Sequence, residues 1–201
     1  MPKIAVLDHG SGNLHSVSRA LAHAGAEPLV TSAPGEAIGA DALLIPGVGH
    51  AGHCVRAVRS LGLDRTIQEF ADSGRPVVGV CVGMQILFEA SEEDLEPMLG
   101  LLPGVCRRLA DTVKVPHIGW NEVSWERDHP FVEGMAAGTR FYFVHSYAPE
   151  LGEATVGSTE HGRAFTAVAA HRNVFATQFH PEKSGDAGLQ LYANLVKAVS
   201  A

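Results

Sequence analysis

Apolar and polar positions follow two different patterns along this chain. Before about residue 105, short and largely apolar runs recur as KIAVLD, AEPLVT, DALLIPG and RPVVGV. Between them, the segments LHSVSRALAHAG and LDRTIQEFADSG place apolar side chains three and four residues apart, which is the spacing of one face of a helix. Buried strands that alternate with such helices predict a parallel sheet covered on both faces.

After about residue 105 the runs become alternating and rich in aromatic residues. They read WNEVSWE, TRFYFVHSY, FTAVAA and NVFATQFH, with turn signals such as ERDHP and EHGR between them, which predicts antiparallel strands. The final segment, GDAGLQLYANLVKAVS, predicts a C-terminal helix with Leu189, Tyr192, Leu195 and Val196 on one face. The fold predicted is α/β, with a mixed, mostly parallel central sheet flanked by helices and antiparallel strands in the C-terminal half.

Length and composition fit one ordered globular domain. The 201 residues are 46% hydrophobic and 18% charged, which supplies enough apolar material for one core without disulfides or a structural metal. No linker, repeat or low-complexity segment divides the chain. We therefore expect a single domain over residues 1–201.

Charge and targeting signals argue against several classes of function. The net charge is −7, and the 15 Lys and Arg residues are scattered, which gives no electrostatic footprint for nucleic acid. No apolar run approaches the ~20 residues that cross a bilayer, and MPKIAVLD lacks the features of a signal peptide. We expect a cytoplasmic protein without a nucleic-acid or membrane partner.

Cysteine and histidine spacing bears on metals and redox chemistry. The three cysteines, Cys54, Cys81 and Cys106, form no C-x-x-C pair, which fits a reducing compartment. The 11 histidines include no H-x-x-x-H and no cluster with cysteine at zinc-finger spacing. We predict neither a metal nor another cofactor.

Cys81 is the candidate nucleophile. It lies in G-x-C-x-G, between Gly79 and Gly83, at the predicted carboxyl end of a parallel strand, where open α/β sheets bind ligands. A sharp strand-to-helix turn of this form presents a nucleophile and aims the amide of Val82 at a developing oxyanion. The alternative is a small buried hydrophobe, which is the commoner state of a cysteine and the interpretation that we keep for Cys54 and Cys106.

The segment ATQFHPEKS supplies a candidate base and a group to orient it. Pro181 disfavours the helical conformation at His180, so His180 and Glu182 should share one face of an extended segment. The alternative is an ordinary strand-ending turn with a solvated glutamate. The order Cys, His, Glu differs from that of α/β-hydrolases, in which the acid precedes the histidine.

A second source of oxyanion donors is PGVGHAG, residues 46–52, at the end of the run ALLI. Its glycines permit a backbone N–H to turn toward a ligand. Taken alone, the segment is equally consistent with a simple turn.

Together, PGVG, GVCVGMQ and QFHPEKS resemble the triad-type (class I) glutamine amidotransferases. DHGSGN and VPHIGWNEV, with FYFVHSY and HPEKS, are similar to one family among them, the glutaminase subunits of imidazole glycerol phosphate synthase. The resemblance implies hydrolysis of L-glutamine to glutamate and ammonia through a cysteinyl thioester, with ammonia passed on in histidine biosynthesis.

The resemblance also implies roles for individual residues. Cys81 would attack the amide, His180 would carry the proton, and Glu182 would orient His180. The further residues that it implies are the oxyanion donors Val82 with Val48 or Gly49, and the glutamine-binding residues Gln85, Val144, His145 and Ser146. Without the resemblance, Gln85 could be a polar residue at the start of a buried helix, and His145 an ordinary strand histidine.

A partner is implied as well, because free ammonia would be protonated and lost before it reached an acceptor. The family's partner is a separate (β/α)8-barrel cyclase, which forms imidazole glycerol phosphate and an aminoimidazole carboxamide ribonucleotide. By position the predicted contacts of this heterodimer are Asn13, Pro116, Ile118, Trp120, Asn121 and Lys183. For Ile118 and Trp120, burial against the sheet is an equally weighted alternative.

The sequence departs from the family pattern at His9, where an aromatic residue is common, at Val82, where leucine is usual, and at Ala176, where glycine is frequent. Three other hypotheses remain open at this point. The chain could serve a purine or chorismate synthase, act as a non-catalytic glutamine-sensing or docking subunit, or be an unrelated cysteine hydrolase of similar fold.

Overall fold

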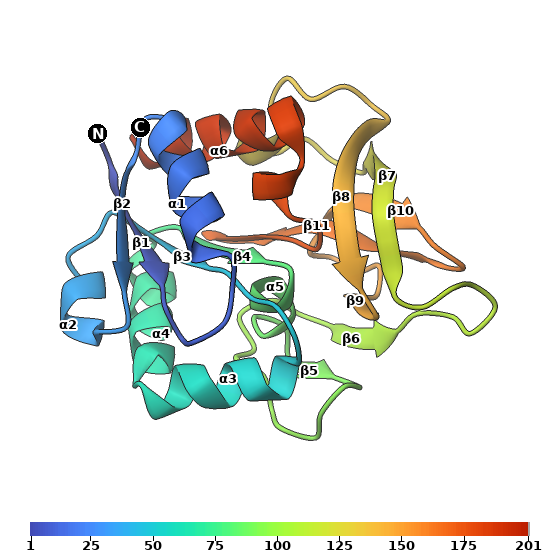
Figure 1. Cartoon of the computed structure of the whole chain (residues 1–201), viewed down its shortest axis with the longest axis horizontal. Coiled ribbons are helices and arrows are strands. Elements are labelled where there is room, and N and C mark those ends of the chain that lie inside the picture. The colour runs from blue at the N-terminus through green and yellow to red at the C-terminus, as the bar shows by residue number, and fades with distance from the viewer. Residues whose placement is uncertain (201) are drawn as a thin grey trace.

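A nine-stranded sheet runs through the molecule (Figure 1). In the computed structural model, which describes residues 1–200, the strand order is β2-β1-β3-β4-β12-β11-β10-β7-β8. The strands are β1 (Lys3–Leu7), β2 (Glu27–Thr31), β3 (Ala42–Ile45), β4 (Val77–Val80), β7 (His117–Trp125), β8 (Thr139–His145), β10 (Thr155–Glu160), β11 (Ala164–His171) and β12 (Val174–Thr177).

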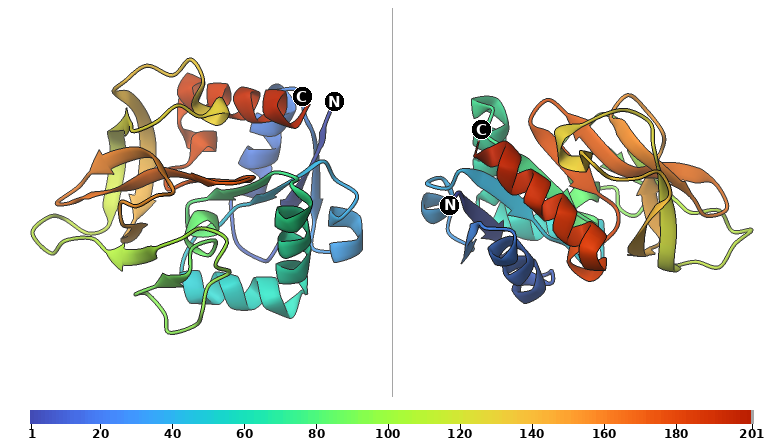
Figure 2. Two further views of the ribbon diagram at one scale, coloured as in Figure 1. Left: turned by 180° about the vertical axis from the view of Figure 1, so that it is seen from behind. Right: turned by 90° about the horizontal axis from the view of Figure 1, so that it is seen from above.

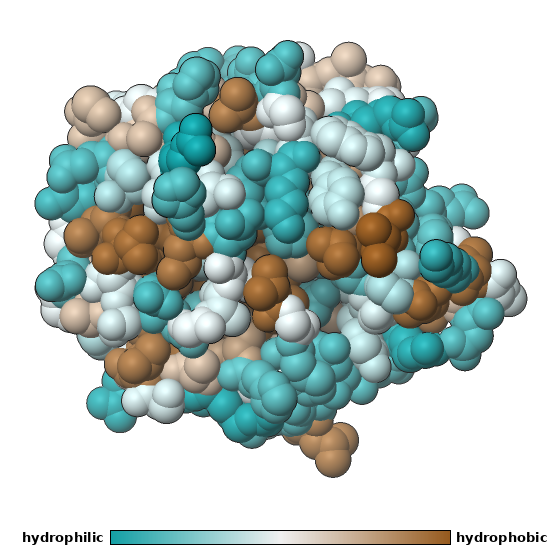
Figure 3. All heavy atoms as spheres, in the orientation of Figure 1, coloured by the Kyte–Doolittle hydropathy of each residue, from teal (hydrophilic) through white to brown (hydrophobic). Residues whose placement is uncertain are grey.

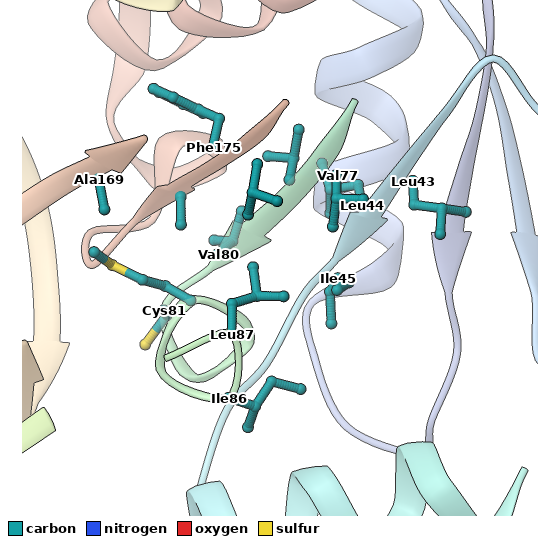
Figure 4. Close-up of a cluster of buried hydrophobic side chains, with 14 of the residues drawn as sticks. Leu43, Leu44, Ile45, Val77, Val80, Cys81, Ile86, Leu87, Ala169 and Phe175 are labelled. Atoms are coloured by element: carbon teal, nitrogen blue, oxygen red, sulfur yellow. The ribbon is translucent and has the colours of Figure 1, made fainter. Parts of the chain in front are cut away.

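The first five strands in this order, from β2 to β12, pair in parallel. The short apolar runs predict β1 to β4, whereas β12 comes from a run that predicted an antiparallel strand. Every residue of β3 and β4 is buried, because helices cover both faces of this part of the sheet. Figure 4 shows the buried side chains of Leu44, Val77 and Val80 spread along these strands, with Cys81 where β4 ends. The core therefore extends directly to the strand ends where the candidate site lies.

The helices cover the parallel strands on two sides (Figures 1 and 2). On one side α1 packs against α6, and on the other α3 packs against α4. Connections between parallel strands are right-handed, so helices that lead toward opposite edges of the sheet must cover opposite faces of it. The helices are α1 (Leu14–His23), α2 (Pro34–Ala37), α3 (Ala51–Ser60), α4 (Leu63–Ser73), α5 (Val82–Gln85) and α6 (Gly185–Val199), with 3₁₀ turns η1 (Pro130–Val132) and η2 (Pro181–Lys183).

The predicted helices at residues 14–25, 63–74 and 185–200 are confirmed as α1, α4 and α6. Helix α3 was not predicted, although Cys54, Val55 and Val58 form its buried face. Among residues 1–200, no helix combines the length and apolar character that a bilayer crossing needs.

The antiparallel half contains β11, β10, β7 and β8, and a small sheet of β5 (Ala90–Ser91), β6 (Val105–Arg108) and β9 (Tyr147–Pro149) lies beside it. The predicted strand NVFATQFH forms β12, which belongs to both halves. It pairs antiparallel with β11 and parallel with β4, so that Thr177 lies opposite Val80. The residues that follow β12 are thereby placed next to those that follow β4.

Backbone segments pack directly on one another where β3 and β4 end. A Cβ on Gly83 would lie 1.9 Å from the carbonyl oxygen of Ile45, and a Cβ on Gly47 would lie 2.4 Å from the amide nitrogen of Gly83. Real side-chain atoms do not approach so closely. The turn after β4 and the loop after β3 can therefore touch only because both positions are glycine.

Gly83→Ala should lower the free energy of unfolding by about 2 kcal/mol or more, because the methyl group meets a backbone oxygen that cannot move aside. Chemical denaturation measures the change. Gly35→Ala is a matched control, since no atom lies within 4 Å of its Cβ position and Gly35 lies in helix α2. An equal loss of stability in the two variants would contradict the packing described.

Candidate active site

Cys81 occupies a strained turn between β4 and α5. Its φ of 57° and ψ of −112° lie in a region that non-glycine residues rarely adopt. Such strain costs on the order of 1–3 kcal/mol and persists only where the surrounding structure holds it. The amide of Cys81 donates to the carbonyl oxygen of Thr177 at 2.8 Å, which anchors the turn to β12. Helix α5 is a single turn, and the amides at its start add partial positive charge beside the sulfur.

The Cys81 sulfur is nearly covered, with 2% of the residue exposed. The sulfur lies 3.8 Å from the carbonyl oxygen of Val144, and Nε2 of Gln178 donates to the sulfur at 3.8 Å. The other two cysteines are buried and free. Burial raises the pKa of Cys54 to about 12 and raises the pKa of Cys106 still further, so both stay inert thiols.

His180 and Glu182 form a buried pair. Nδ1 of His180 lies 2.8 Å from Oε1 of Glu182, and their side chains are 2% and 1% exposed. The segment is not extended as predicted, because Pro181 begins the 3₁₀ turn η2 directly after His180. His180 itself keeps an extended conformation, and the predicted contact forms across the turn. The interpretation of Glu182 as a solvated turn residue is therefore wrong.

His180 is held in its charged form. Burial alone would lower its pKa, but the neighbouring sulfur of Cys81 and carboxylate of Glu182 favour the imidazolium and raise the pKa to about 10. Nε2 is buried and completes no hydrogen bond among residues 1–200. At neutral pH the ring can therefore give up a proton from Nε2 to a group bound beside Cys81.

The loop after β3 and the turn after β4 offer amide donors. The N–H groups of Val48, Gly49 and Val82 donate to no acceptor within residues 1–200. Gly49 has a φ of 86°, which glycine adopts freely. Unpaired amides beside a nucleophile can stabilise an oxyanion.

His9 holds the start of this loop. Its Nε2 lies 2.7 Å from the carbonyl oxygen of Pro46, and because a carbonyl only accepts, Nε2 carries the hydrogen. A Cβ on Gly12 would lie 2.9 Å from Pro46. The departure from the family pattern at His9 therefore supplies a bond that a purely apolar ring would lack.

The candidate residues surround one cavity of about 390 Å³. Its lining consists of Val48, Gly49, Cys81, Val82, Gln85, Glu93, Pro116, Val144, His145, Ser146, Tyr147, His180 and Lys183. Gln85 is buried, and its Nε2 donates to the carbonyl oxygen of Tyr147 at 2.8 Å and to Oε1 of Gln178 at 3.1 Å. The structure thus brings together every predicted oxyanion and glutamine-binding residue with Cys81 and His180, and Glu182 supports His180 from outside the cavity lining.

Sequence reasoning missed three residues at this site. Gln178 touches the Cys81 sulfur, Tyr147 accepts from Gln85, and Glu93 lines the cavity as an acidic group. Gln178 and Tyr147 lie inside motifs already recognised, and proximity to His180 and His145 could have signalled them. Glu93 lies in the run SEEDLEP, where nothing distinguishes it from its acidic neighbours.

Of the predicted partner contacts, two lie at the cavity, three lie on β7 and Asn13 lies apart from both. Pro116 and Lys183 line the cavity, and Ile118 and Trp120 are 58% and 50% exposed, so the alternative of burial against the sheet is wrong for both. The Asn121 side chain bonds within the chain, to the carbonyl oxygen of Glu160. Asn13 lies directly before α1. Figure 3 shows a broken band of apolar side chains across the middle of one face.

Comparisons with known proteins agree with the geometry of the site. The family model for glutamine amidotransferase class-I matches residues 5–198. Two similar relatives are named imidazole glycerol phosphate synthase subunit HisH. The relative from Nocardia farcinica (strain IFM 10152) is 46% identical, over 98% of this chain and 98% of its own length. The relative from Thermobifida fusca (strain YX) is 45% identical, over 97% of this chain and 98% of its own length.

Solved structures support the fold. The structure of PurLQS from Thermotoga maritima has a TM-score of 0.79 and 19% identity, and the match covers 98% of this chain and 99% of that chain. A crystal structure of a glutamine amidotransferase has a TM-score of 0.77 and 21% identity, covering 98% and 99%.

Glu182→Gln should lower the pKa of His180. The carboxylate favours the imidazolium and burial opposes it, so removing the negative charge leaves burial with less opposition. The wild-type ring should stay protonated until the pH approaches about 10, and the variant ring should lose its proton at lower pH. An NMR titration of the His180 ring measures both values.

Glu69→Gln provides the control, because Glu69 is exposed on α4. It should leave the His180 titration unchanged. A Glu182→Gln curve that coincides with the wild-type curve would mean that the carboxylate does not hold the charge on His180.

Proposed function

The chain belongs to the class-I glutamine amidotransferase family, and from that membership we propose that it is the glutaminase subunit of an imidazole glycerol phosphate synthase. The observation that carries the proposal is the convergence of Cys81, His180 and unpaired amides on one cavity. The reaction is the hydrolysis of L-glutamine to glutamate and ammonia.

The first half of the reaction forms a thioester. The Cys81 sulfur, as the thiolate, attacks the side-chain amide carbon of glutamine, and a carbon–sulfur bond forms. His180, as the imidazolium, donates its Nε2 proton to the amide nitrogen, the carbon–nitrogen bond breaks, and ammonia leaves. Glu182 holds Nδ1 of His180, so that Nε2 is the nitrogen that exchanges the proton.

The second half consumes one water. Neutral His180 takes a proton from the water, the resulting oxygen nucleophile attacks the thioester carbon, and the carbon–sulfur bond breaks. Glutamate leaves, while the thiolate of Cys81 and the imidazolium of His180 are restored. In both halves a negative charge develops on the former amide oxygen. The amides of Val82 and of Val48 or Gly49 would stabilise this charge. A donor of this kind lowers the activation barrier by about 3 kcal/mol.

The cavity also suits the other end of glutamine, which carries an ammonium and a carboxylate. The acidic side chain of Glu93 provides a counter-charge for the ammonium. The backbone of Val144, His145 and Ser146 forms a neighbouring wall, and Gln85 is fixed beside it. We assign these residues to substrate binding.

Release of ammonia serves a synthase only if an acceptor subunit binds at the cavity mouth. A (β/α)8-barrel cyclase that makes imidazole glycerol phosphate and an aminoimidazole carboxamide ribonucleotide fits this part. Exposed Ile118 and Trp120, with Pro116 and Lys183 nearer the mouth, form an apolar centre with a charged edge, as interfaces do. Asn13 and Asn121 belong to the same proposed contact surface. Three free buried cysteines support a cytoplasmic complex.

Cys81→Ala should abolish turnover, with a loss of roughly 10³-fold or more in ammonia release. The sulfur makes the covalent bond on which both half-reactions depend, yet it contributes little to the fold, so the variant should still bind the cyclase. The measurement is ammonia release from glutamine with and without the cyclase and its nucleotide ligand.

Cys54→Ala is the matched control and should retain turnover, because Cys54 is a buried thiol that does not line the cavity. Absence of Cys81-dependent ammonia release in every combination would overturn the proposed activity. Release stimulated only by a different synthase would overturn the proposed partner.

Glu93→Gln should raise the KM for glutamine about tenfold, while kcat changes less, because the charge contacts a part of the substrate that does not react. Steady-state kinetics with the cyclase present measure both constants. Glu89→Gln changes a nearby exposed carboxylate outside the cavity and should change neither. An unchanged KM in Glu93→Gln would remove Glu93 from the substrate site.

A further inference from the structure

A chain of hydrogen bonds runs from β7 to the wall of the cavity. Nδ2 of Asn121 lies 3.4 Å from Nε2 of His117. Nδ1 of His117 lies 3.1 Å from Nε2 of His145, and Nδ1 of His145 lies 2.9 Å from the carbonyl oxygen of Tyr147. His117 and His145 are both buried, although neither the triad nor the oxyanion donors use them.

The direction of every bond in this chain follows from its two ends. The Tyr147 carbonyl can only accept, so Nδ1 of His145 carries the hydrogen and Nε2 of a neutral ring is the acceptor. Nδ1 of His117 must then donate to it, which leaves Nε2 of His117 to accept from the Asn121 amide. The amide orientation agrees, because Oδ1 of Asn121 accepts from the Glu122 N–H and Nδ2 also donates to the Glu160 carbonyl.

Both rings stay neutral, as this directed chain requires. Burial, helped by the nearby His161, lowers the pKa of His117 to about 4. Burial, helped by neighbouring histidines of which His117 has the largest effect, lowers the pKa of His145 to about 3. His180, on the other side of the cavity, has the opposite shift because Glu182 and Cys81 lie beside it. The cavity is therefore lined by one charged imidazole and one neutral imidazole.

Aromatic packing holds His117 in place. Its ring stacks on His161 at a centroid distance of 4.2 Å and on Phe143 at 5.0 Å. His161 is itself fixed through Nε2 to the carbonyl oxygen of Lys114 at 2.8 Å. The stacked neighbours fix the ring plane, and the hydrogen bonds fix the rotation within it.

The far end of the hydrogen-bond chain lies in the proposed glutamine-binding wall of the cavity. The Tyr147 carbonyl accepts from His145 and also from Gln85, so one oxygen ties two proposed substrate residues together. His145, Ser146 and Tyr147 are consecutive and all line the cavity. Any rotation of the His145 ring would break the bond to Tyr147 and release the backbone between them.

We propose that His117 is a positioning residue for the glutamine subsite, which donates to Nε2 of His145 and so fixes the tautomer and orientation of that ring and the path of the backbone from Val144 to Tyr147. The inference rests on the proposed glutaminase function for its kinetic consequence. It adds a residue that does not line the cavity, and it assigns the His145 side chain a role distinct from that of its backbone.

Two substitutions of His117 test its hydrogen-bond donor and its aromatic ring separately. His117→Phe keeps an aromatic ring for stacking but leaves the Nε2 lone pair of His145 buried and unpaired. His117→Gln restores an amide donor without an aromatic ring. We expect His117→Phe to raise the KM for glutamine about tenfold with a smaller change in kcat, since an unpaired buried group destabilises the bound arrangement, and His117→Gln to recover most of the loss.

The spectroscopic test does not depend on turnover. In ¹⁵N-labelled wild-type protein, His145 should show a protonated Nδ1 and an unprotonated Nε2 whose resonance carries the shift of a hydrogen-bonded acceptor. In His117→Phe that resonance should move toward the position of an unbonded ring nitrogen, and in His117→Gln it should return. His161→Phe is the control, because it keeps an aromatic ring stacked on His117 and His161 has no part in the hydrogen-bond chain.

The outcomes test the positioning role of His117 separately from the proposed glutaminase function. A His145 ring protonated at Nε2 in the wild type overturns the inference, even if the variants do not fold. So does a His145 Nε2 resonance unmoved in His117→Phe, or a His117→Gln variant no better than His117→Phe in KM. If the wild type releases no ammonia while the resonances behave as expected, the hydrogen-bond chain stands and the glutaminase function fails.

Discussion

The parallel pairing of β12 with β4 is the constraint on which the rest of the site depends. It places Thr177 opposite Val80 and lets the Thr177 carbonyl accept the Cys81 amide at 2.8 Å. The nucleophile turn and the segment that carries His180 thus leave neighbouring strands at one edge of the sheet, where ligands bind in open α/β folds. The same pairing brings Gln178 against the sulfur. Without it, a strained cysteine backbone at φ 57° would have no anchor on this side.

Electrostatic differences between chemically identical side chains give the cavity its character. His180 is charged because a carboxylate and a sulfur oppose the effect of burial, whereas His145 is neutral because burial is opposed only by a backbone carbonyl. Among the cysteines, burial is the main cause that raises the pKa of Cys54 and of Cys106, so both remain thiols. Position rather than residue type therefore decides which imidazole is charged and which is neutral.

Local patterns predicted much of this arrangement. The glycines around Cys81 and the Pro–Glu sequence after His180 shape residues that are adjacent to them in the sequence. Their effects could therefore be predicted from the sequence alone. The helices α1, α4 and α6 and the parallel strands followed from periodicity. The position of β12 in both halves of the sheet did not, because strand partners are set by long-range packing. Glu93 was missed as a site residue for the same reason, since its place in the cavity lining depends on contacts across the fold. For Ile118 and Trp120 the pattern left burial and exposure equally weighted, and only the structure distinguishes them.

Everything proposed for this site requires that Cys81 forms a covalent thioester with the acyl group of glutamine. This step is tested most directly by rapid acid quenching of the working complex, in which glutamine is mixed with this chain, the cyclase and its nucleotide ligand. The intact mass is measured and fragment ions locate the modification. We expect a transient mass gain of one γ-glutamyl group, located at Cys81 and absent without glutamine. Ammonia release with no adduct at Cys81, or with the acyl group on Cys54 or Cys106, would contradict it.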